Sequence, residues 1–205
     1  MQLLKGLYVI ADIDCTGADN IISKTDEVLT AGVKIIQYRD KVSTQSDRYK
    51  IAENLRKLTH EHSSLLLIND DTQLATSIDA DGIHLGKDDM SIQEARSILG
   101  DNKIIGASCY ASYMNAQPAI DASADYIAFG SFFSSSTKPD APRANIDLLQ
   151  RAKQDFKVPV CAIGGITPQN AAPLLAAGTD MIAVIRGVFS ASSPKQAVQE
   201  YFSIM

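Results

Sequence analysis

Short apolar runs alternate with amphipathic stretches along the whole chain, which predicts alternating strands and helices. Turn residues bound the apolar runs, and the stretches between them carry apolar positions at helical spacing. The predicted strands cover residues 7-12, 35-40, 65-70, 82-86, 103-108, 125-130, 159-165 and 181-187. The predicted helices cover residues 19-31, 45-62, 72-78, 91-99, 112-122, 145-155, 168-177 and 194-203.

Start and stop signals support several of these helices. Ser91 and Glu94 have the spacing of a capping box, and Gly100 and Gly178 follow predicted helix ends. Pro168 is placed at an early helical position, where its missing N–H costs least. The helix boundaries therefore rest on local chemistry as well as on periodicity.

Strict alternation of strand and helix predicts a parallel sheet, because each right-handed crossover starts the next strand in the same direction. Eight such units favour a closed (β/α)8 TIM barrel of the α/β class over an open, doubly wound sheet. The first strand-to-helix turn, "ADIDCTGAD", also lacks the glycine fingerprint of dinucleotide binding. We find no linker or low-complexity tract, so residues 1-205 are predicted to form a single domain.

Composition and charge narrow the classes of partner. The chain has 205 residues, 45% of them apolar, which is enough for one large core. A net charge of -5 gives no basic field for nucleic acid or an anionic membrane, so the expected partners are small molecules. No apolar run approaches the ~20 residues of a membrane span, and the start does not resemble a secretory signal. We expect a cytoplasmic protein, and a homo-oligomer is compatible with the sequence.

Three cysteines, Cys15, Cys109 and Cys161, are widely spaced along the chain. Their odd number and spacing fit neither a disulfide framework nor a paired zinc motif. We expect them to be reduced, with Cys109 and Cys161 facing the core.

Polar residues collect where the predicted strands end, which is where barrels of this type carry their chemistry. If strand geometry persists through "IIQYRDK", alternate residues of this segment leave the same face. The residues delivered to this end include Gln37, Arg39, Lys41, Asn69, Asp70, Asp71, Asp88, Asp89 and Ser108.

Acidic pairs on neighbouring strands would repel one another unless a cation lies between them. Magnesium prefers oxygen ligands and takes only one or two protein carboxylates, leaving other positions to water and phosphate oxygens. Asp70 and Asp89 are the better candidate ligands for Mg²⁺. Asp71 and Asp88 are instead interpreted as helix N-cap residues or solvated turn acids.

Cations at the same end suggest a diphosphate-sized anion. Arg39 offers a planar fork that matches phosphate oxygens, whereas Lys41 and Lys138 supply compact charges. Cations and a metal together can also stabilise a diphosphate that is leaving. The alternative is that these side chains are ordinary surface charges, which for Lys138 weighs as much as the functional interpretation.

Two further segments could bind a phosphate. "SSSTK" supplies hydroxyl groups and N–H donors, and "AIGGI" lets backbone approach an anion before a helix, although a Gly-Gly pair also fits a plain tight turn.

His84 could point into the barrel near the site, but a hydrogen-bonded core imidazole is favoured. No Ser-His-Asp or Cys-His arrangement is evident, which disfavours covalent catalysis.

The motifs "IQYRDK", "LINDD", "DGIHLGKDD", "IGASCY", "ADYIAFGSFFSSSTK", "AIGGIT" and "MIAVIRGVF" together resemble the thiamine phosphate synthase family in order and spacing. The resemblance covers nearly the whole chain. It implies a transferase that joins 4-amino-5-hydroxymethyl-2-methylpyrimidine diphosphate to a thiazole phosphate, releasing diphosphate and forming thiamine phosphate.

The resemblance also implies roles for individual residues. Arg39, Lys41, Lys138 and Ser108 would act in catalysis, and Mg²⁺ would be bound by Asp70 and Asp89. The pyrimidine diphosphate would be held by Gln37, Arg39, Lys41, Asn69, Ser108 and Lys138. The thiazole phosphate would lie against Ser135, Thr137, Gly165, Ile185 and Arg186, largely through backbone groups.

Two segments depart from the family pattern. The family usually has Gly-Pro-x-x-Pro-Thr-x-Thr-Lys where this chain reads "GSFFSSSTK" from Gly130 to Lys138, so a looser loop is expected. A small residue is common at the position of Arg186, whose guanidinium either adds to the phosphate clamp or turns outward.

The predicted chemistry is a dissociative substitution, in which diphosphate departs before the thiazole nitrogen attacks. Such a step needs electrostatic stabilisation and positioning more than a strong base. Three alternatives stay open: a thiazole tautomerase or other phosphate-binding barrel isomerase, a barrel enzyme that acts on another sugar phosphate, and a noncatalytic protein that binds thiamine phosphate.

Overall fold

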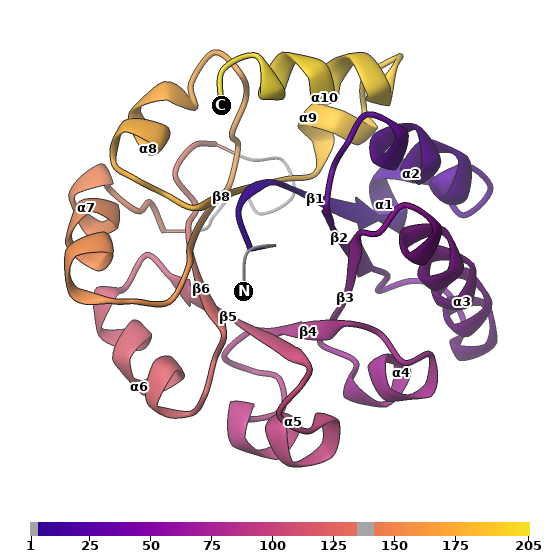
Figure 1. Ribbon diagram of the computed structural model, residues 1–205, viewed down its shortest axis with the longest axis horizontal. Helices are drawn as coiled ribbons and strands as arrows, with labels where there is room; N and C mark the ends of the chain where they lie inside the picture. The colour runs from indigo at the N-terminus through magenta and orange to yellow at the C-terminus, as the bar shows by residue number, and fades with distance from the viewer. Residues whose placement is uncertain (1–3, 135–141) are drawn as a thin grey trace.

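The computed structural model describes residues 4–134 and 142–205, and its strands form a closed parallel barrel in sequence order (Figure 1). The predicted TIM barrel is therefore confirmed. The strands are β1 (Gly6–Asp12), β2 (Ile35–Arg39), β3 (Leu65–Asn69), β4 (Gly82–Leu85), β5 (Ile104–Tyr110), β6 (Tyr126–Phe129), β7 (Val160–Ile163) and β8 (Met181–Val184).

The helices form an outer ring around the strands (Figure 1). The eight predicted helices all have counterparts, and two short helices, α1 and α9, are additional. The helices are α1 (Ile13–Thr16), α2 (Ile21–Thr30), α3 (Gln45–Glu61), α4 (Thr72–Ser77), α5 (Ile92–Leu99), the 3₁₀ turn η1 (Tyr113–Asn115), α6 (Ala116–Asp121), α7 (Ile146–Asp155), α8 (Ala172–Ala176), α9 (Arg186–Phe189) and α10 (Pro194–Phe202).

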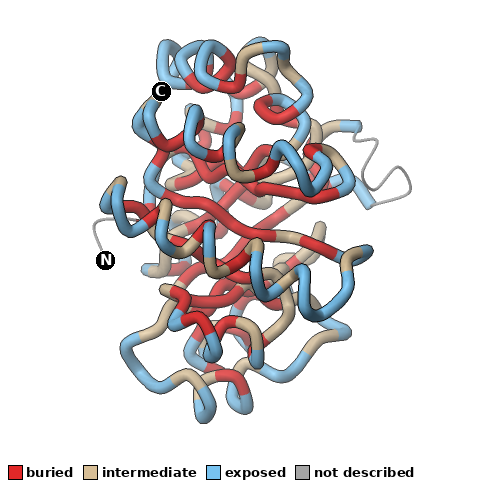
Figure 2. The backbone as a smooth tube through the Cα atoms, turned by 90° about the vertical axis from the view of Figure 1, so that its right-hand side faces the viewer, coloured by how far each residue is buried: buried red, intermediate tan, exposed pale blue. Residues whose placement is uncertain are grey.

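Alternation along each strand sends side chains to two separate cores. In β1, Leu7 and Val9 pack outward under the helices, whereas Tyr8 and Ile10 join the cluster inside the barrel. Figure 2 shows the buried backbone concentrated in the strands, with exposed residues on the outer helices and loops. Because both faces are covered, the strands read as apolar runs.

Two strands end two or more residues earlier than predicted. The seventh strand stops at Ile163, because Gly164 and Gly165 have φ values of 106° and 63° that leave the extended region. The eighth strand ends at Val184, and Arg186 begins the short helix α9 instead of continuing the strand. Both changes occur where the chain turns across the barrel's carboxyl end.

The predicted helix start at Pro168 is wrong, since α8 begins at Ala172. The Asn170 carboxamide accepts from the Thr167 N–H at 2.8 Å and donates to the Gly165 carbonyl at 3.0 Å. These bonds hold a polar turn where the helix was expected, because the side chain competes for backbone groups that a helix would use. The Ser91–Glu94 capping box is confirmed.

Within residues 4–134 and 142–205, no helix combines the length and apolar content that a bilayer crossing requires.

Cys109 and Cys161 are buried as predicted, and all three cysteines are free thiols. Burial raises the pKa of the Cys109 thiol to about 12, which keeps it protonated and unreactive.

Candidate active site

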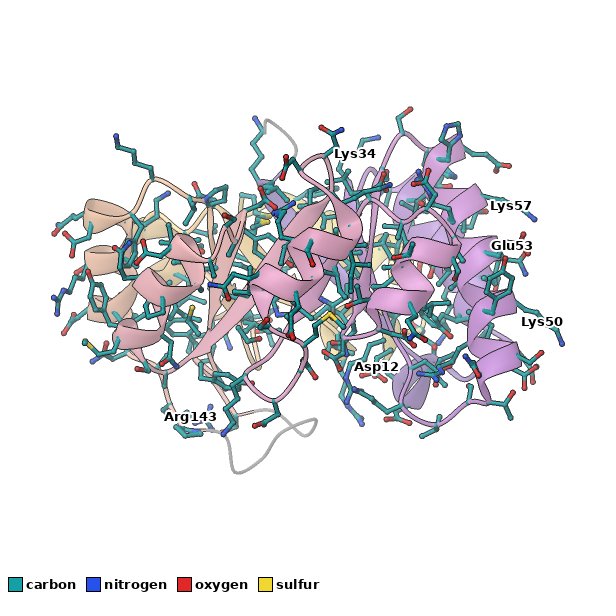
Figure 3. All side chains as sticks on the ribbon, turned by 90° about the horizontal axis from the view of Figure 1, so that it is seen from below. Asp12, Lys34, Lys50, Glu53, Lys57 and Arg143 are labelled. Carbon is teal, nitrogen blue, oxygen red and sulfur yellow. The ribbon has the colours of Figure 1, made fainter. Side chains whose placement is uncertain are left out.

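The polar side chains predicted at the strand ends meet at the carboxyl end of the barrel. In Figure 3, Asp12 and Arg143 lie at one end of the barrel, whereas Lys34, which precedes β2, lies at the other. A cavity of about 330 Å³ is formed among the strand ends. Its lining includes the predicted site residues Gln37, Arg39, Asn69, Ser108, Gly165, Ile185 and Arg186.

The remaining predicted residues divide into two groups. Lys41, Asp70 and Asp89 do not line the cavity, but they adjoin it through Asn69, which donates to Asp70. The other three lie outside the described residues: Ser135, Thr137 and Lys138.

Extended geometry stops at Arg39, so Lys41 is not placed by strand alternation. The next residue, Asp40, is buried, and its carboxylate accepts from the backbone N–H groups of Val42 at 3.0 Å and Ser43 at 2.9 Å and from the Tyr38 hydroxyl at 2.8 Å. Burial alone would raise the pKa of Asp40, but these hydrogen bonds outweigh it and hold the pKa below its usual range. Asp40 thus anchors the turn that carries Lys41.

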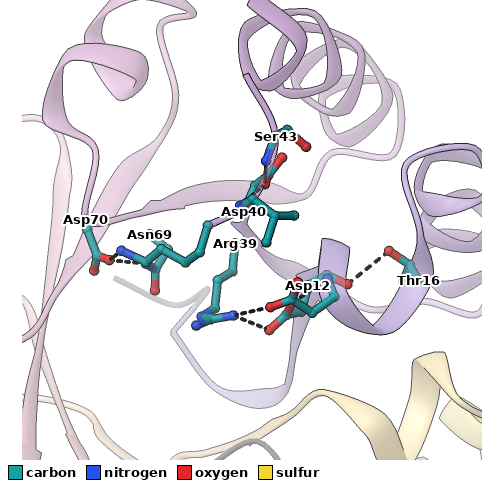
Figure 4. Close-up of polar contacts among 10 residues, drawn as sticks. Asp12, Thr16, Arg39, Asp40, Ser43, Asn69 and Asp70 are labelled. Carbon is teal, nitrogen blue, oxygen red and sulfur yellow. Dashed lines mark hydrogen bonds and ion pairs between the residues drawn. The ribbon is translucent and has the colours of Figure 1, made fainter. Parts of the chain in front are cut away.

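Arg39 is held by carboxylates from the first strand and the helix after it (Figure 4). Its Nη1 donates to Asp12 Oδ2 at 2.7 Å and lies 3.7 Å from Asp14 Oδ2. The two strand ends are in register, with Asp12 opposite Arg39. Because the Asp12 side chain is only 3% exposed, this ion pair fixes the guanidinium at the cavity wall.

Sequence reasoning missed Asp12. It lies two residues beyond Ile10 and four beyond Tyr8, which both belong to the cluster inside the barrel, so alternation along β1 could have indicated an inward carboxylate. In the apolar pattern it is only the last residue of the predicted strand 7-12.

Asp70 is the meeting point of two donors. Lys41 Nζ and Asn69 Nδ2 both donate to Asp70 Oδ2 (Figure 4). The backbone of Asp70 has a φ of 62°, a left-handed conformation that few residues other than glycine adopt. Such strain is concentrated at functional sites, where the surrounding structure holds it in place.

Asp89 brings a second carboxylate to Asp70. Its Oδ2 accepts from the Gly86 N–H at 2.7 Å, and the Asp70 carboxylate is close enough to act on it electrostatically. Burial and the neighbouring Asp70 raise the pKa of Asp89 above its usual range. Two acidic groups this close require a shared proton or a cation.

This pair fits a magnesium ion better than it fits a metal enclosed by protein. Among residues 4–134 and 142–205, no group of three or more His, Cys, Asp or Glu side chains could enclose a metal. Magnesium usually keeps several waters and binds through one or two carboxylates together with substrate phosphates. Asp70 and Asp89 supply that number of oxygen donors.

The neighbouring acids have structural positions, as predicted. Asp71 caps α4 by accepting from the Leu74 N–H at 2.9 Å, and it lies 3.4 Å from Arg48. Asp88 is exposed. Asp70 and Asp89 are therefore the adjacent pair of carboxylates, whereas Asp71 caps a helix and Asp88 is exposed to solvent.

The Gly164–Gly165 turn forms another part of the cavity wall. A Cβ on Gly164 would lie 2.1 Å from Ser131 Oγ, and one on Gly165 would lie 2.2 Å from the Ser134 carbonyl oxygen. Both positions thus require glycine for space and for positive φ. The tight turn is confirmed, and it brings bare backbone to the cavity.

Ile185 and Arg186 complete this side of the cavity. Ile185 is the residue before α9, and Arg186 is the first residue of that helix. Arg186 is exposed while lining the cavity, so its guanidinium is accessible to a ligand there.

A hydrogen-bonded chain crosses the inside of the barrel beneath these groups. Gln37 Nε2 donates to the Tyr8 hydroxyl at 2.5 Å, and the Tyr8 and Tyr126 hydroxyls are 2.9 Å apart. His84 Nδ1 lies 2.8 Å from the Tyr126 hydroxyl, and His84 Nε2 lies 2.9 Å from Ser108 Oγ. We call these five residues the tyrosine–histidine chain.

His84 is hydrogen-bonded as predicted, but it also lines the cavity. The pattern of apolar positions does not indicate Tyr8 and Tyr126 as polar groups of the site, because both lie within apolar runs. One available signal was Gly106, since a Cβ there would lie 2.0 Å from Tyr126 Cζ. A strand glycine often marks the close approach of another group.

Comparisons with known proteins identify the family of the chain. Residues 7–188 match the family described as thiamine monophosphate synthase. The thiamine-phosphate synthase of Marinobacter nauticus is 48% identical over 92% of this chain and 84% of the relative. The thiamine-phosphate synthase of Nitrosococcus oceani is 43% identical over 97% of this chain and 91% of the relative.

A solved structure is similar throughout. The thiamine phosphate pyrophosphorylase from Pyrococcus furiosus has a TM-score of 0.90 and 36% sequence identity. The similarity covers 99% of this chain and 96% of that one, so it includes the barrel and every strand end described above.

Proposed function

The chain belongs to the thiamine monophosphate synthase family and has the activity of a thiamine-phosphate synthase, and we propose how the described residues perform it. The transferase joins a pyrimidine diphosphate to a thiazole phosphate. The C–O bond between the pyrimidine methylene and diphosphate breaks, and its electron pair leaves with diphosphate. The lone pair of the thiazole nitrogen then forms the new C–N bond, giving thiamine phosphate.

One observation carries the assignment of roles: a cavity lined by amide, hydroxyl and guanidinium groups adjoins an adjacent pair of carboxylates. A diphosphate presents several anionic oxygens, and an aminopyrimidine presents both donors and acceptors. Arg39 and Lys41 would neutralise the diphosphate, while Gln37, Asn69 and Ser108 would orient the pyrimidine diphosphate. This division follows from charge and from the donor inventory of each side chain.

Asp70 and Asp89 would hold Mg²⁺, which when bound supplies positive charge to the diphosphate oxygens. The Lys41 ammonium, which donates to Asp70, would keep a second positive charge beside the same oxygens. Stabilising the leaving group in this way favours departure before attack. No strong base is then required from the cavity.

The thiazole phosphate would lie against the Gly164–Gly165 turn, where backbone can approach an anion closely. Arg186 at the start of α9 would add a charge to the phosphate clamp. Ile185, Ser135 and Thr137 would also contact the thiazole phosphate, largely through backbone groups, whereas Lys138 would help to hold the pyrimidine diphosphate.

A single assay tests this function. Purified protein is mixed with both substrates and Mg²⁺, and thiamine phosphate is followed by chromatography. Product that depends on both substrates and on Mg²⁺ supports the proposal. Conversion of the thiazole phosphate alone would indicate a tautomerase or another isomerase, and binding of thiamine phosphate without product would indicate a noncatalytic protein.

The proposal extends to the cellular compartment and the partners of the enzyme. Small-molecule substrates and the acidic net charge of -5 fit a cytoplasmic enzyme that does not bind nucleic acid. A homo-oligomer stays a prediction that sedimentation would test.

A further inference from the structure

We propose that the tyrosine–histidine chain is a one-way relay of hydrogen-bond donors that fixes His84 as its Nε2–H tautomer and thereby makes Ser108 a donor toward the ligand. Gln37, Tyr8, Tyr126 and His84 are positioning residues in this scheme. The inference rests on the proposed function only for its kinetic measurements.

The direction of donation along the tyrosine–histidine chain is set at Gln37. Its amide nitrogen faces the Tyr8 hydroxyl, and an amide N–H can only donate, so the Tyr8 oxygen accepts. The Tyr8 hydroxyl hydrogen is then available to another acceptor. Tyr8 is 1% exposed, and in the described part of the chain its other hydrogen-bond partner is the Tyr126 oxygen. Leaving a buried hydroxyl hydrogen unpaired is costly, so Tyr8 donates to Tyr126.

Donors and acceptors can be assigned in the same way at Tyr126. Burial raises the pKa of both tyrosines, so each keeps its one hydroxyl hydrogen. Having accepted from Tyr8, the Tyr126 hydroxyl donates to His84 Nδ1 at 2.8 Å. A ring nitrogen that accepts carries no hydrogen, so the proton of neutral His84 is on Nε2.

Ser108 receives the last donation. His84 Nε2–H donates to Ser108 Oγ at 2.9 Å, which leaves the serine hydroxyl hydrogen free to turn toward the cavity that Ser108 lines. In the opposite tautomer Ser108 would donate to Nε2 and could only accept from a ligand. The tautomer therefore decides whether Ser108 suits an acceptor, such as a phosphate oxygen or a ring nitrogen.

The packing also preserves this arrangement. His84 and Tyr126 are stacked with ring centroids 5.6 Å apart, and Tyr8 meets Tyr126 edge to face at 6.1 Å. Gly106 leaves the space that the Tyr126 ring occupies. Five different strands thus supply one chain, from Gln37 on β2 to Ser108 on β5.

Nitrogen NMR of the intact protein tests the tautomer without any activity. With ¹⁵N-labelled histidine and His84→Gln to assign the signals, wild-type His84 should show a protonated Nε2 and an unprotonated Nδ1. Tyr126→Phe removes the donor to Nδ1 and should shift the signals toward a mixture of tautomers. Tyr113→Phe, which removes a hydroxyl bonded to Asp155, is the matched control and should leave them unchanged. A proton on Nδ1 in the wild-type protein would overturn the proposal.

Two substitutions at His84 test the consequence for Ser108. Glutamine places an N–H donor near the position of Nε2, whereas asparagine places its polar group near Nδ1. His84→Gln should retain turnover within about threefold, and His84→Asn should lose at least tenfold, a difference of the size of one hydrogen bond. Equal losses in the two variants would contradict the donor role. If the NMR result holds while no variant or wild-type protein forms product, the proposed function fails and the tautomer assignment stands.

Discussion

Asp12 and Arg39 form a 2.7 Å ion pair between the last residues of β1 and β2, although they lie 27 positions apart in the sequence. The guanidinium that lines the cavity is thus held by a buried carboxylate rather than extended into solvent. Its orientation depends on a residue that the family motifs quoted above do not include.

We expect Asp12→Asn to lower kcat/KM for the pyrimidine diphosphate about tenfold, because Arg39 loses its orienting charge. Asparagine can still cap α1, where Asp12 Oδ1 accepts from the Asp14 N–H at 2.9 Å. Stability should therefore fall by only ~1.5–3 kcal/mol, the usual range for losing a hydrogen bond to a charged group. Steady-state kinetics and urea unfolding measure the two effects.

The control for this variant is Asp14→Asn. That carboxylate lies 3.7 Å from Arg39 and is 52% exposed, so its removal should change kcat/KM little. Similar losses from both variants would show that net charge, rather than the orientation of Arg39, matters.

Asp70→Asn and Asp89→Asn should each lower Mg²⁺-dependent turnover by about a hundredfold or more. Mutating residues that only hydrogen-bond to a metal's ligands already lowers metal affinity or activity ~10–100-fold, and loss of a ligand itself should cost at least as much. The matched control is Asp88→Asn, an exposed neighbour that should keep near-normal activity. Titrating Mg²⁺ in the assay measures the loss. Normal turnover in Asp70→Asn would remove that residue from the metal site.

Asp89→Asn also has an expected effect without metal. Because the pKa of Asp89 is raised in the folded protein, ionising it at neutral pH opposes folding. The amide should therefore raise the melting temperature of the metal-free protein while activity falls. A lower melting temperature would indicate that the carboxylate stabilises the fold.

The fold could be predicted because each strand and helix has its own local spacing of apolar residues, and these spacings alternate along the chain. The errors arose where individual side chains or glycines overrode the pattern. Asn170 holds a turn in place of a helix start, and Gly164 and Gly165 end β7 by adopting positive φ. Neither effect changes the average hydrophobicity of its segment, so a pattern of apolar positions does not detect it.

The site was predicted where residue type and strand position agree, as for Gln37, Arg39 and Asn69. It was missed where a polar group belongs to a residue that also packs well in a core. Tyr8 and Tyr126 contribute large apolar rings and one hydroxyl each, and only the closed barrel brings those hydroxyls together. Their role depends on contacts 118 residues apart.

Asp40→Asn should destabilise the protein by ~2 kcal/mol at neutral pH, since the buried carboxylate accepts three hydrogen bonds. The folded pKa of Asp40 is depressed, so its contribution is present above the unfolded pKa of ~3.9 and is lost as pH falls through the folded value. Urea unfolding from pH 7 to pH 2 should show the wild-type advantage over Asp40→Asn shrinking only below about pH 4.

The exposed Asp47, which lies at the start of α3, provides the comparison. Asp47→Asn should cost less than Asp40→Asn at neutral pH because its contacts are exposed. A difference between wild type and Asp40→Asn that stays constant to pH 2 would contradict the depressed pKa.

Arg186→Ser should raise KM for the thiazole phosphate several-fold with little change in KM for the pyrimidine diphosphate, because the exposed guanidinium lines the side of the cavity with the Gly164–Gly165 turn. The effect should weaken as salt rises, since an exposed charge is screened over ~8–10 Å at ionic strengths of 0.1–0.15 M. Lys195→Ser, which removes an exposed charge on α10, is the control and should leave both KM values unchanged. Unaltered KM values in Arg186→Ser would mean that the guanidinium turns away and only backbone binds the phosphate.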